Sequence, residues 1–315
     1  SMAFIQNGHT GVFQVTDLPE APLLSVATIF DHIQNYPNLT ERLNKAYKSN
    51  LVYKDSFKQG NGGSGVDMKR VLDLSPERLV EIVKSDSALL SDLHAVIGEE
   101  TFDKFMAFWS EAATIAPKLT EALGNAIGCD NVKHDAHYNF RSVDYYVRPS
   151  SNIPPRCGEH RDFGSYTLIY TNTSGLEVFV DGKWQRLVVP SQSTTAILLF
   201  GWCTQIRSNK RITAVLHRVV NDYTLNETAN RKLSLILFVA PKEASTSLDP
   251  VVLVGERQQY INGVKVGQLR GSMARKWKMR EGTLKQEDYV LEEADIIING
   301  KTQDELVQRT IAAQY

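Results

Sequence analysis

Apolar residues at helical intervals fill most of the first part of the chain. A helical stretch is predicted over about 22–48, with a break at Pro37 because proline cannot continue a helix. Ser75 predicts the cap of another helix, which has proline at its first position and ends at about Ser85. The longest pattern, over about 99–127, has the apolar spacing of an amphipathic helix.

Other segments carry the patterns of strands. Residues 11–16 alternate, and over about 138–240 the chain is rich in Val, Ile, Thr, Tyr and Phe, with turn residues at short intervals. Residues 176–187 predict a hairpin whose Asp-Gly pair forms the tight turn. Residues 194–200 and 232–240 predict two further strands.

The order of these elements indicates the fold class. Helices come first, strands lie in the middle, and a polar helix is predicted over about 302–315. This order favours an α+β fold, mainly β in its core, built around an antiparallel sheet sandwich. We expect a helical N-terminal region with short strands over 1–135 and a strand-rich core with a C-terminal helix over 136–315. The two regions are expected to form one integrated unit.

Composition and charge argue against several kinds of partner. The 315 residues include 42% hydrophobic and 23% charged residues, as in ordinary globular proteins. A net charge of -1 gives no reason to expect binding to nucleic acid or to an anionic membrane. No apolar run approaches the roughly 20 residues that span a bilayer. Three widely spaced cysteines and no evident signal peptide predict a cytoplasmic protein, and we expect a monomer.

Two motifs are set aside. Gly60, Gly62 and Gly65 match a dinucleotide-binding pattern, but no apolar strand precedes them and no apolar helix follows, so a flexible loop is expected. His134 and His137 have a spacing that could bind a metal from a helix, yet no third ligand is evident. We expect that segment to form a surface turn or a loop facing the substrate.

The strongest chemical signal comes from His160, Asp162 and His217. In a strand, positions 160 and 162 point to the same face because side chains alternate. Two such ligands plus a distant histidine form the 2-His-1-carboxylate triad of non-heme Fe(II) oxygenases, which leaves coordination positions open for O2 and an organic ligand. On their own the three residues also fit a site that binds no metal, because a lone histidine in an apolar strand is commonly a core residue.

The flanking sequence resembles the Fe(II)/2-oxoglutarate-dependent oxygenases, specifically the isopenicillin N synthase-like group. The similarity covers roughly residues 11–240, and it implies a distorted double-stranded β-helix, or jelly roll, with helices packed around it. The similar segments are the first-domain strand 11–15, the turn 66–69, the metal strand 158–169, the hairpin 175–184 and the second histidine's strand 216–220.

The resemblance also implies a site for the distal carboxylate of 2-oxoglutarate, normally an Arg-x-Ser on a late strand. Here the serine is Ser234, and Lys232 stands two residues before it in place of arginine. Arg231 is adjacent, but in a regular strand it points away from the face that Lys232 shares with Ser234. Either Lys232 binds the carboxylate, which we favour, or a bulge rotates Arg231 inward. Both basic groups could instead lie in solvent.

Two more residues are assigned by the resemblance. Tyr146 matches the family tyrosine that helps to hold the same carboxylate. Asp144 stands where the family usually has asparagine, near the end of 2-oxoglutarate that binds the metal. A carboxylate there would repel the cosubstrate unless it were protonated or paired.

The activity implied by the resemblance is oxidation of a small molecule, of the kind found in secondary metabolism. Iron would be bound by His160, Asp162 and His217, with 2-oxoglutarate and O2 in the remaining positions and succinate and CO2 as coproducts. Hydroxylation, desaturation and oxidative ring closure all stay open. Two alternatives remain: an iron oxidase of the same fold that needs no 2-oxoglutarate, and a non-catalytic jelly-roll binding protein. Basic residues expected near the rim, which bind an acidic substrate or lie in solvent, are Arg148, Arg156, Arg161, Arg207 and Lys210.

Overall fold

The computed structural model describes most of the chain. The described residues are 11–47, 51–55, 67–145, 156–222, 230–280 and 293–301, together with the backbone of 4–6. The predicted glycine loop over 60–65 and the predicted helix over 302–315 lie outside them, as do Tyr146 and Arg148.

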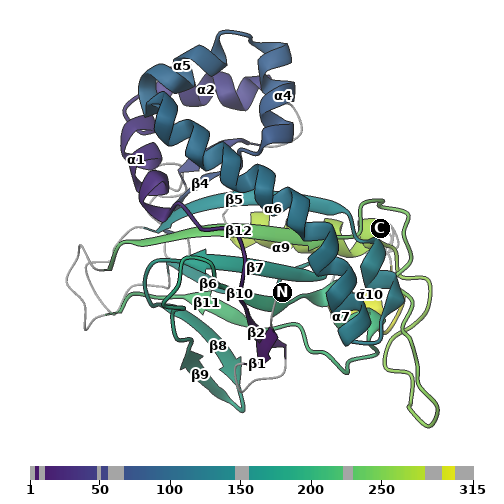
Figure 1. Cartoon of the computed structure of the whole chain (residues 1–315). Coiled ribbons are helices and arrows are strands. Elements are labelled where there is room, and N and C mark those ends of the chain that lie inside the picture. The colour runs from purple at the N-terminus through teal and green to yellow at the C-terminus, as the bar shows by residue number, and fades with distance from the viewer. Residues whose placement is uncertain are drawn as a thin grey trace.

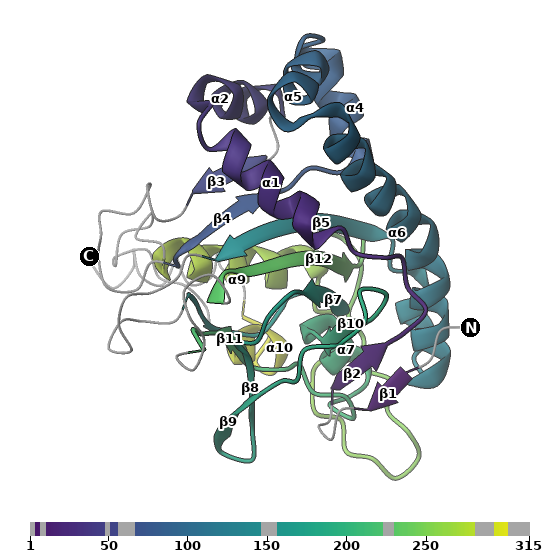
Figure 2. The same ribbon diagram turned by 60° about the vertical axis from the view of Figure 1, so that its left-hand side comes forward.

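The described strands form two antiparallel sheets that face each other (Figures 1 and 2). The larger sheet has the order β1-β2-β10-β7-β12-β5-β4-β3, and the smaller sheet has the order β6-β11-β8-β9. The larger sheet consists of β1 (Phe4–Gln6), β2 (Val12–Val15), β10 (Ala196–Phe200), β7 (Tyr166–Thr171), β12 (Lys232–Ala240), β5 (His137–Tyr145), β4 (Lys69–Leu72) and β3 (Tyr53–Asp55). The smaller sheet consists of β6 (Cys157–His160), β11 (His217–Val219), β8 (Leu176–Val180) and β9 (Lys183–Arg186).

Helices cover the outer face of the larger sheet. Figure 1 shows the long helix α6 crossing this face, with the shorter N-terminal helices gathered at one end. The helices before the core strands are α1 (Leu23–Ile33), α2 (Pro37–Ala46), α4 (Pro76–Ser85), α5 (Leu89–Ile97), α6 (Glu99–Ala126) and the short 3₁₀ helix η1 (Asp130–His134). The later helices are α7 (Trp202–Arg207), α9 (Val266–Arg280) and α10 (Glu293–Ile297).

Most of the predicted helices are confirmed, and their ends have identifiable causes. Pro37 is the first residue of α2, so the proline separates two helices rather than bending one. Ser75 caps α4 by accepting a hydrogen bond from the backbone N–H of Arg78. The pattern over 99–127 became α6. The helices α5, α7, α9 and α10 were not predicted, because they are short or lie in mixed sequence.

The predicted hairpin is also confirmed. Asp181 and Gly182 join β8 to β9 with φ angles of 50° and 76°, and positive φ at both turn residues is what a two-residue hairpin of this hand requires.

Alternation along each strand of the larger sheet separates two cores. On β12, Leu233, Leu235 and Leu237 pack against the helices, in one hydrophobic cluster. The neighbouring positions point the other way, and Ile236 belongs to a second cluster that lies between the two sheets. This architecture agrees with the predicted α+β class. The division at residue 135 stays a prediction, although strands from both sides of it share one sheet.

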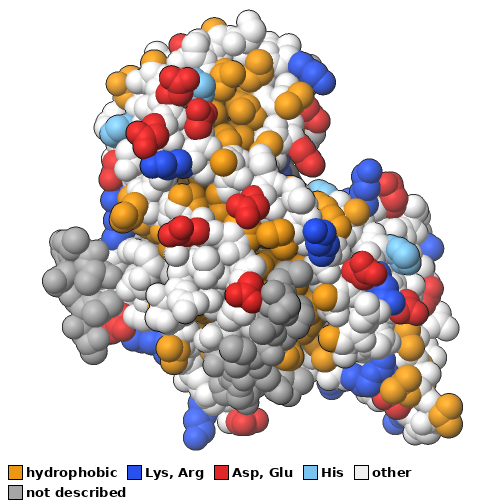
Figure 3. Space-filling view, viewed as in Figure 1, with side chains coloured by type: hydrophobic (Ala, Val, Ile, Leu, Met, Phe, Trp, Pro, Cys, Tyr) orange, Lys and Arg blue, Asp and Glu red, His pale blue; other side chains and the backbone are white. Residues whose placement is uncertain are grey.

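The surface carries no face of a single charge sign in the view of Figure 3. Acidic and basic side chains are mixed, as the net charge of -1 suggests. No helix in the described part of the chain is long and apolar enough to cross a bilayer.

Candidate metal centre

Two neighbouring strands of the smaller sheet bring the predicted metal ligands together. His160 ends β6, His217 begins β11, and the two residues are direct partners in the antiparallel pair. Their ring centroids lie 4.2 Å apart. Asp162 follows β6 by two residues and is buried beside both rings.

The three side chains could bind a common ion. One ligand atom from each lies within 4.8 Å of the others. The Oδ1 atom of Asp162 is 3.5 Å from Nε2 of His160 and 3.9 Å from Nε2 of His217. Two atoms that bind one metal at about 2.1 Å and at a right angle lie about 3 Å apart. Among the residues that the structure describes, no other group of His, Cys, Asp or Glu comes together in this way.

Each ligand is oriented by a neighbour in its own segment. Nδ1 of His160 lies 2.8 Å from the carbonyl oxygen of Gly158, and Nδ1 of His217 lies 2.9 Å from that of Val215. A carbonyl only accepts, so Nδ1 carries the proton and Nε2 keeps its lone pair for a metal. This orientation is the form in which histidine binds metal ions.

The carboxylate is held in the same manner. The hydroxyl of Thr167 donates a 2.6 Å hydrogen bond to Oδ2 of Asp162, which leaves Oδ1 toward the histidines. Thr167 lies on β7 of the larger sheet, so the two sheets meet at the site.

The protonation states suit a metal. Burial, together with the proximity of His160, lowers the pKa of His217 to about 4, so its imidazole is neutral at neutral pH. Burial alone raises the pKa of Asp162, but His217, His160 and Thr167 outweigh that effect and hold the pKa below its ordinary value. A neutral imidazole and an ionised carboxylate are the ligand forms of these side chains.

The donor set fits a non-heme iron. Two imidazole nitrogens and one carboxylate oxygen on one side of an ion match the facial triad. The His160 side chain is 23% exposed, against 8% for Asp162 and 6% for His217, so His160 marks the side that solvent reaches. Trp277 of α9 stands on that side with its ring centroid 5.2 Å from that of His160.

Comparison with known proteins points to one superfamily. Residues 136–241 match the sequence model of the 2OG-Fe(II) oxygenase superfamily. This part of the chain is similar to that superfamily, and several relatives and solved structures agree with the similarity. Gibberellin 20 oxidase 3 of Arabidopsis thaliana is 29% identical over 179 residues, which are 54% of this chain and 43% of that protein. Protein DMR6-LIKE OXYGENASE 2 of the same plant is 30% identical over 154 residues, 46% of this chain and 40% of that protein. The chain therefore spans less than half the length of these relatives.

Solved structures show the same fold across most of the chain. The rice dioxygenase for auxin oxidation superposes with a TM-score of 0.60 at 16% identity, covering 88% of each chain. The dioxygenase for auxin oxidation 1 of Arabidopsis thaliana, solved as a complex with 2-oxoglutarate, superposes with a TM-score of 0.55 at 19% identity, covering 79% of this chain and 91% of that one. The predicted jelly roll of the 2OG-Fe(II) oxygenases is thereby confirmed.

Lys232 and Ser234 lie on the inner face of the larger sheet, the face that Thr167 shares. Both side chains are buried, with exposed fractions of 1%. Nζ of Lys232 donates to Oγ1 of Thr171 at 2.6 Å, and the hydroxyl of Ser234 donates to the same Oγ1 at 3.3 Å. The structure therefore brings the two predicted cosubstrate residues together around Thr171, which the sequence did not indicate.

Arg231 and Asp144 lie on the opposite face. The β5–β12 pairing runs without a bulge, so Arg231 points outward and pairs with Asp31 of α1 at 2.7 Å. It also lies 2.9 Å from Asp144, which in addition pairs with Arg70. This position does not favour the expected place of Asp144 near 2-oxoglutarate. Its carboxylate joins an ion-pair network between the sheet and α1, which is buried at Asp144 and Arg70 and partly exposed at Arg231 and Asp31.

Among the described residues, Tyr145 is a tyrosine beside the predicted site. It is the direct cross-strand partner of Lys232, and it packs in the cluster between the two sheets. Tyr146, the residue that the resemblance assigned, lies outside the described residues. Side chains alternate along a strand. Because Asp144 points outward, its neighbour Tyr145 must point inward, and this is the signal that identifies Tyr145.

A second group of polar side chains, also missed by the sequence analysis, lies near Tyr145. Nζ of Lys69 is 2.9 Å from Asp67 and 3.2 Å from the sulfur of Cys157, and it stacks 4.8 Å above the ring of Trp277. The charges of Lys69 and Asp67 compensate each other, and both side chains are buried. We therefore interpret this group as a structural link between β4, β6 and α9.

The basic residues predicted at the rim divide into two kinds. Arg156 is fully buried and donates to the carbonyl oxygens of Asn230 and Val220, at 2.7 and 2.8 Å. Arg207 is buried, and its Nη1 donates to both carboxylate oxygens of Asp135, at 2.8 Å each. Neither is a surface cation. Arg161 stacks over Trp202, and Lys210 is exposed.

His134 and His137 both lie at the surface. This agrees with the first of the two expectations, a surface turn. Between them, however, Asp135 is buried with Arg207 and Ser165. The segment therefore contributes a buried ion pair rather than a metal site.

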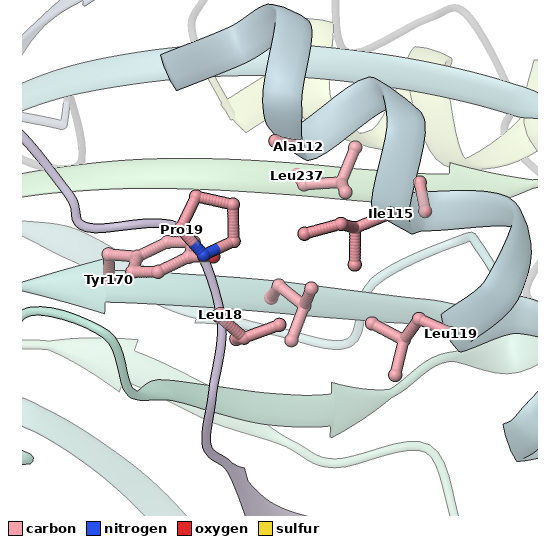
Figure 4. Close-up of a pocket in the computed structure, with 9 residues that line it drawn as sticks. Leu18, Pro19, Ala112, Ile115, Leu119, Tyr170 and Leu237 are labelled. Carbon is pink, nitrogen blue, oxygen red and sulfur yellow. The ribbon is translucent and has the colours of Figure 1, made fainter. Parts of the chain in front are cut away.

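A small apolar cavity lies on the helix side of the larger sheet (Figure 4). Side chains of α6 converge there with Leu18, Pro19 and residues of β7 and β12, among them Leu168 and Leu237. These strand positions point away from Thr167 and Lys232. The cavity measures about 10 Å³, close to the least that one water needs, so it is a packing defect and no substrate site.

Proposed function

We propose that this protein is an Fe(II)- and 2-oxoglutarate-dependent oxygenase that oxidises a small organic molecule. One observation carries the proposal: His160, Asp162 and His217 converge with each ligand atom oriented by a separate hydrogen bond. Such pre-organisation is what metal sites have and what incidental clusters of polar residues lack.

When bound, iron and 2-oxoglutarate supply the oxidative chemistry, in which O2 oxidises the substrate while 2-oxoglutarate becomes succinate and CO2. The part of this chain is to hold and orient. Gly158 and Val215 fix the imidazole tautomers, and Thr167 fixes the carboxylate. Packing around the buried His217 keeps solvent from one side of the site.

For the cosubstrate we propose that Lys232 binds the distal carboxylate, with Ser234 beside it. Both share the inner face of the sheet with Thr167, whose hydroxyl holds an iron ligand. Tyr145 lies opposite Lys232 and is proposed as the tyrosine of this site. We do not assign that role to Arg231, because its guanidinium pairs with two carboxylates on the other face.

The substrate is proposed only by class. The names of the similar proteins concern gibberellin, auxin and feruloyl CoA, and each name describes that protein. For this chain we propose a small molecule that enters past His160 and Trp277. A cytoplasmic monomer acting in secondary metabolism, with residues 1–135 and 136–315 as one unit, remains our expectation.

Two departures from the family pattern favoured an iron oxidase that needs no 2-oxoglutarate: the carboxylate of Asp144 and the replacement of arginine by Lys232. Asp144 points away from the site, so we no longer count it in favour of that alternative. Lys232 lies on the inner face of the larger sheet, where it could bind the cosubstrate. The alternative of a non-catalytic binding protein would give the triad only a structural role. Such a role does not explain why both histidines keep their Nε2 atoms free for a metal.

The test is an anaerobic titration of the Fe(II)-loaded protein with 2-oxoglutarate, followed by the weak visible charge-transfer band of chelation. The proposal predicts a saturable band that His217→Ala abolishes. Iron binding without any band would support the oxidase without 2-oxoglutarate. Absence of iron binding would leave only the non-catalytic alternative.

A further inference from the structure

Lys232 is a buried basic group in an unusual environment. Its side chain is 1% exposed at the first position of β12. Among the residues that the structure describes, no carboxylate lies within ion-pairing distance of its Nζ. The partners found there are the hydroxyl of Thr171 at 2.6 Å and the carbonyl oxygen of Thr173 at 2.8 Å. A buried lysine ammonium ordinarily has an anionic partner, because a lone charge is costly to desolvate.

The two hydrogen bonds match the neutral amine. A neutral amine has two N–H groups, whereas the ammonium form has three. Thr171 is set to accept from Lys232, since its own hydroxyl donates to the carbonyl oxygen of Leu233 at 3.0 Å. Both protons of the amine are therefore satisfied, and a third would have no described acceptor.

The surrounding charges favour the same form. Arg156, from the start of β6, is fully buried nearby and always charged. Burial and then the charge of Arg156 lower the pKa of Lys232 well below its ordinary value. From β5, Tyr145 faces Lys232 with its pKa raised by burial, so it stays a neutral phenol.

The other groups on that side, as far as the structure describes them, supply no uncompensated negative charge. Beyond Tyr145, the ammonium of Lys69 on β4 is paired with Asp67, and Cys157 of β6 lies against both. From β7, Thr171 brings only its hydroxyl.

We propose that Lys232 is a neutral amine in the ligand-free protein and takes up one proton from solvent when 2-oxoglutarate binds. The incoming carboxylate brings the negative charge that the site lacks. The amine becomes an ammonium, and its third N–H donates to that carboxylate. The inference rests on the proposed function, and it adds that cosubstrate affinity falls as pH rises. An arginine at this position would be charged throughout and would show no such coupling.

The experiment is isothermal titration calorimetry of the anaerobic Fe(II)-loaded protein with 2-oxoglutarate. Titrations in two buffers of different ionisation enthalpy, at about pH 8, give the number of protons taken up. For the wild type we expect about one proton per site, and across a pH series we expect up to about tenfold weaker binding per unit rise. Lys232→Arg is the matched control and should bind with uptake near zero.

The outcomes are distinguishable. Binding with no proton uptake, or equal uptake in wild type and Lys232→Arg, overturns this inference and leaves the proposed function standing. Undiminished binding by Lys232→Met overturns it as well, because the carboxylate would then lie elsewhere. Absence of any binding by the wild type overturns the proposed function together with this inference. If Lys232→Arg does not fold, the pH series of the wild type decides.

Discussion

Each proposed iron ligand depends on a residue that has no metal-binding signature of its own. Gly158 and Val215 act through backbone carbonyls, and Thr167 acts from a different sheet. His160, Asp162 and His217 could be predicted from sequence because their spacing is local or matches a motif. Thr167 could not, since its contact exists only once the turn after Asp162 folds back.

Removing that contact gives a prediction at the residue scale. Thr167→Val should weaken Fe(II) affinity by about 10- to 100-fold, because Asp162 loses the hydrogen bond that aims its carboxylate. Competition with a chelator measures this. Thr120→Val is the matched control, since Thr120 is an equally buried hydroxyl bonded to Tyr166 and far from the site along the chain. Equal losses in both variants would contradict a specific role for Thr167.

Lys232 also affects the stability of the metal-free protein. Its pKa is lower when folded than when unfolded, so the unfolded chain binds more protons and stability rises with pH in that interval. As pH rises toward about pH 10, the free energy of unfolding of the wild type should increase, relative to that of Lys232→Met, by about 1.4 kcal/mol per pH unit. Denaturant unfolding of both proteins at two pH values measures it. Parallel stabilities would show that Lys232 is charged in both states.

At the scale of elements, alternation along β5 and β12 separates two functions. The outward face binds α1 through Arg70, Asp144, Arg231 and Asp31, while the inward face carries Lys232. The sequence predicted β12, placed β5 within a strand-rich region, and favoured Lys232 as the carboxylate ligand. It did not show which face carries Asp144, because alignment to a family motif does not reveal a one-residue difference in register.

This separation predicts opposite effects for neighbouring residues. Arg231→Met should cost only about 1 kcal/mol of unfolding free energy, because Asp31 is half exposed and Asp144 keeps Arg70 as a partner, and it should change 2-oxoglutarate affinity less than about twofold. Lys232→Met should lose that affinity and retain the fold. Denaturant unfolding and the anaerobic titration together measure both. Loss of cosubstrate binding in Arg231→Met with an intact fold would contradict the assignment.

At the scale of the molecule, the N-terminal region completes the larger sheet. β4 pairs with β5, and β2 pairs with β10, so strands from the first region lie at both sides of the central strands. The helices α1 and α6 cover the leucines of β12. The patterns of apolar and turn residues predicted that helices precede the strands of the core. The pairing partners required long-range contacts that no local pattern contains.

We therefore expect residues 136–315 alone not to fold cooperatively, because Leu233, Leu235 and Leu237 would lose their cover. Circular dichroism during thermal unfolding, compared with the full chain, measures this. A sharp transition in the isolated segment would show that the two regions are separate domains.

The central claim is that three residues of this chain hold one Fe(II). The most direct test is equilibrium Fe(II) binding under anaerobic conditions by the wild type, His160→Ala, His217→Ala and, as the control, His134→Ala at an exposed histidine. We expect one iron per chain in the wild type and the control, and no tight binding in the other two variants. Retained stoichiometric binding by folded His160→Ala and His217→Ala would contradict it.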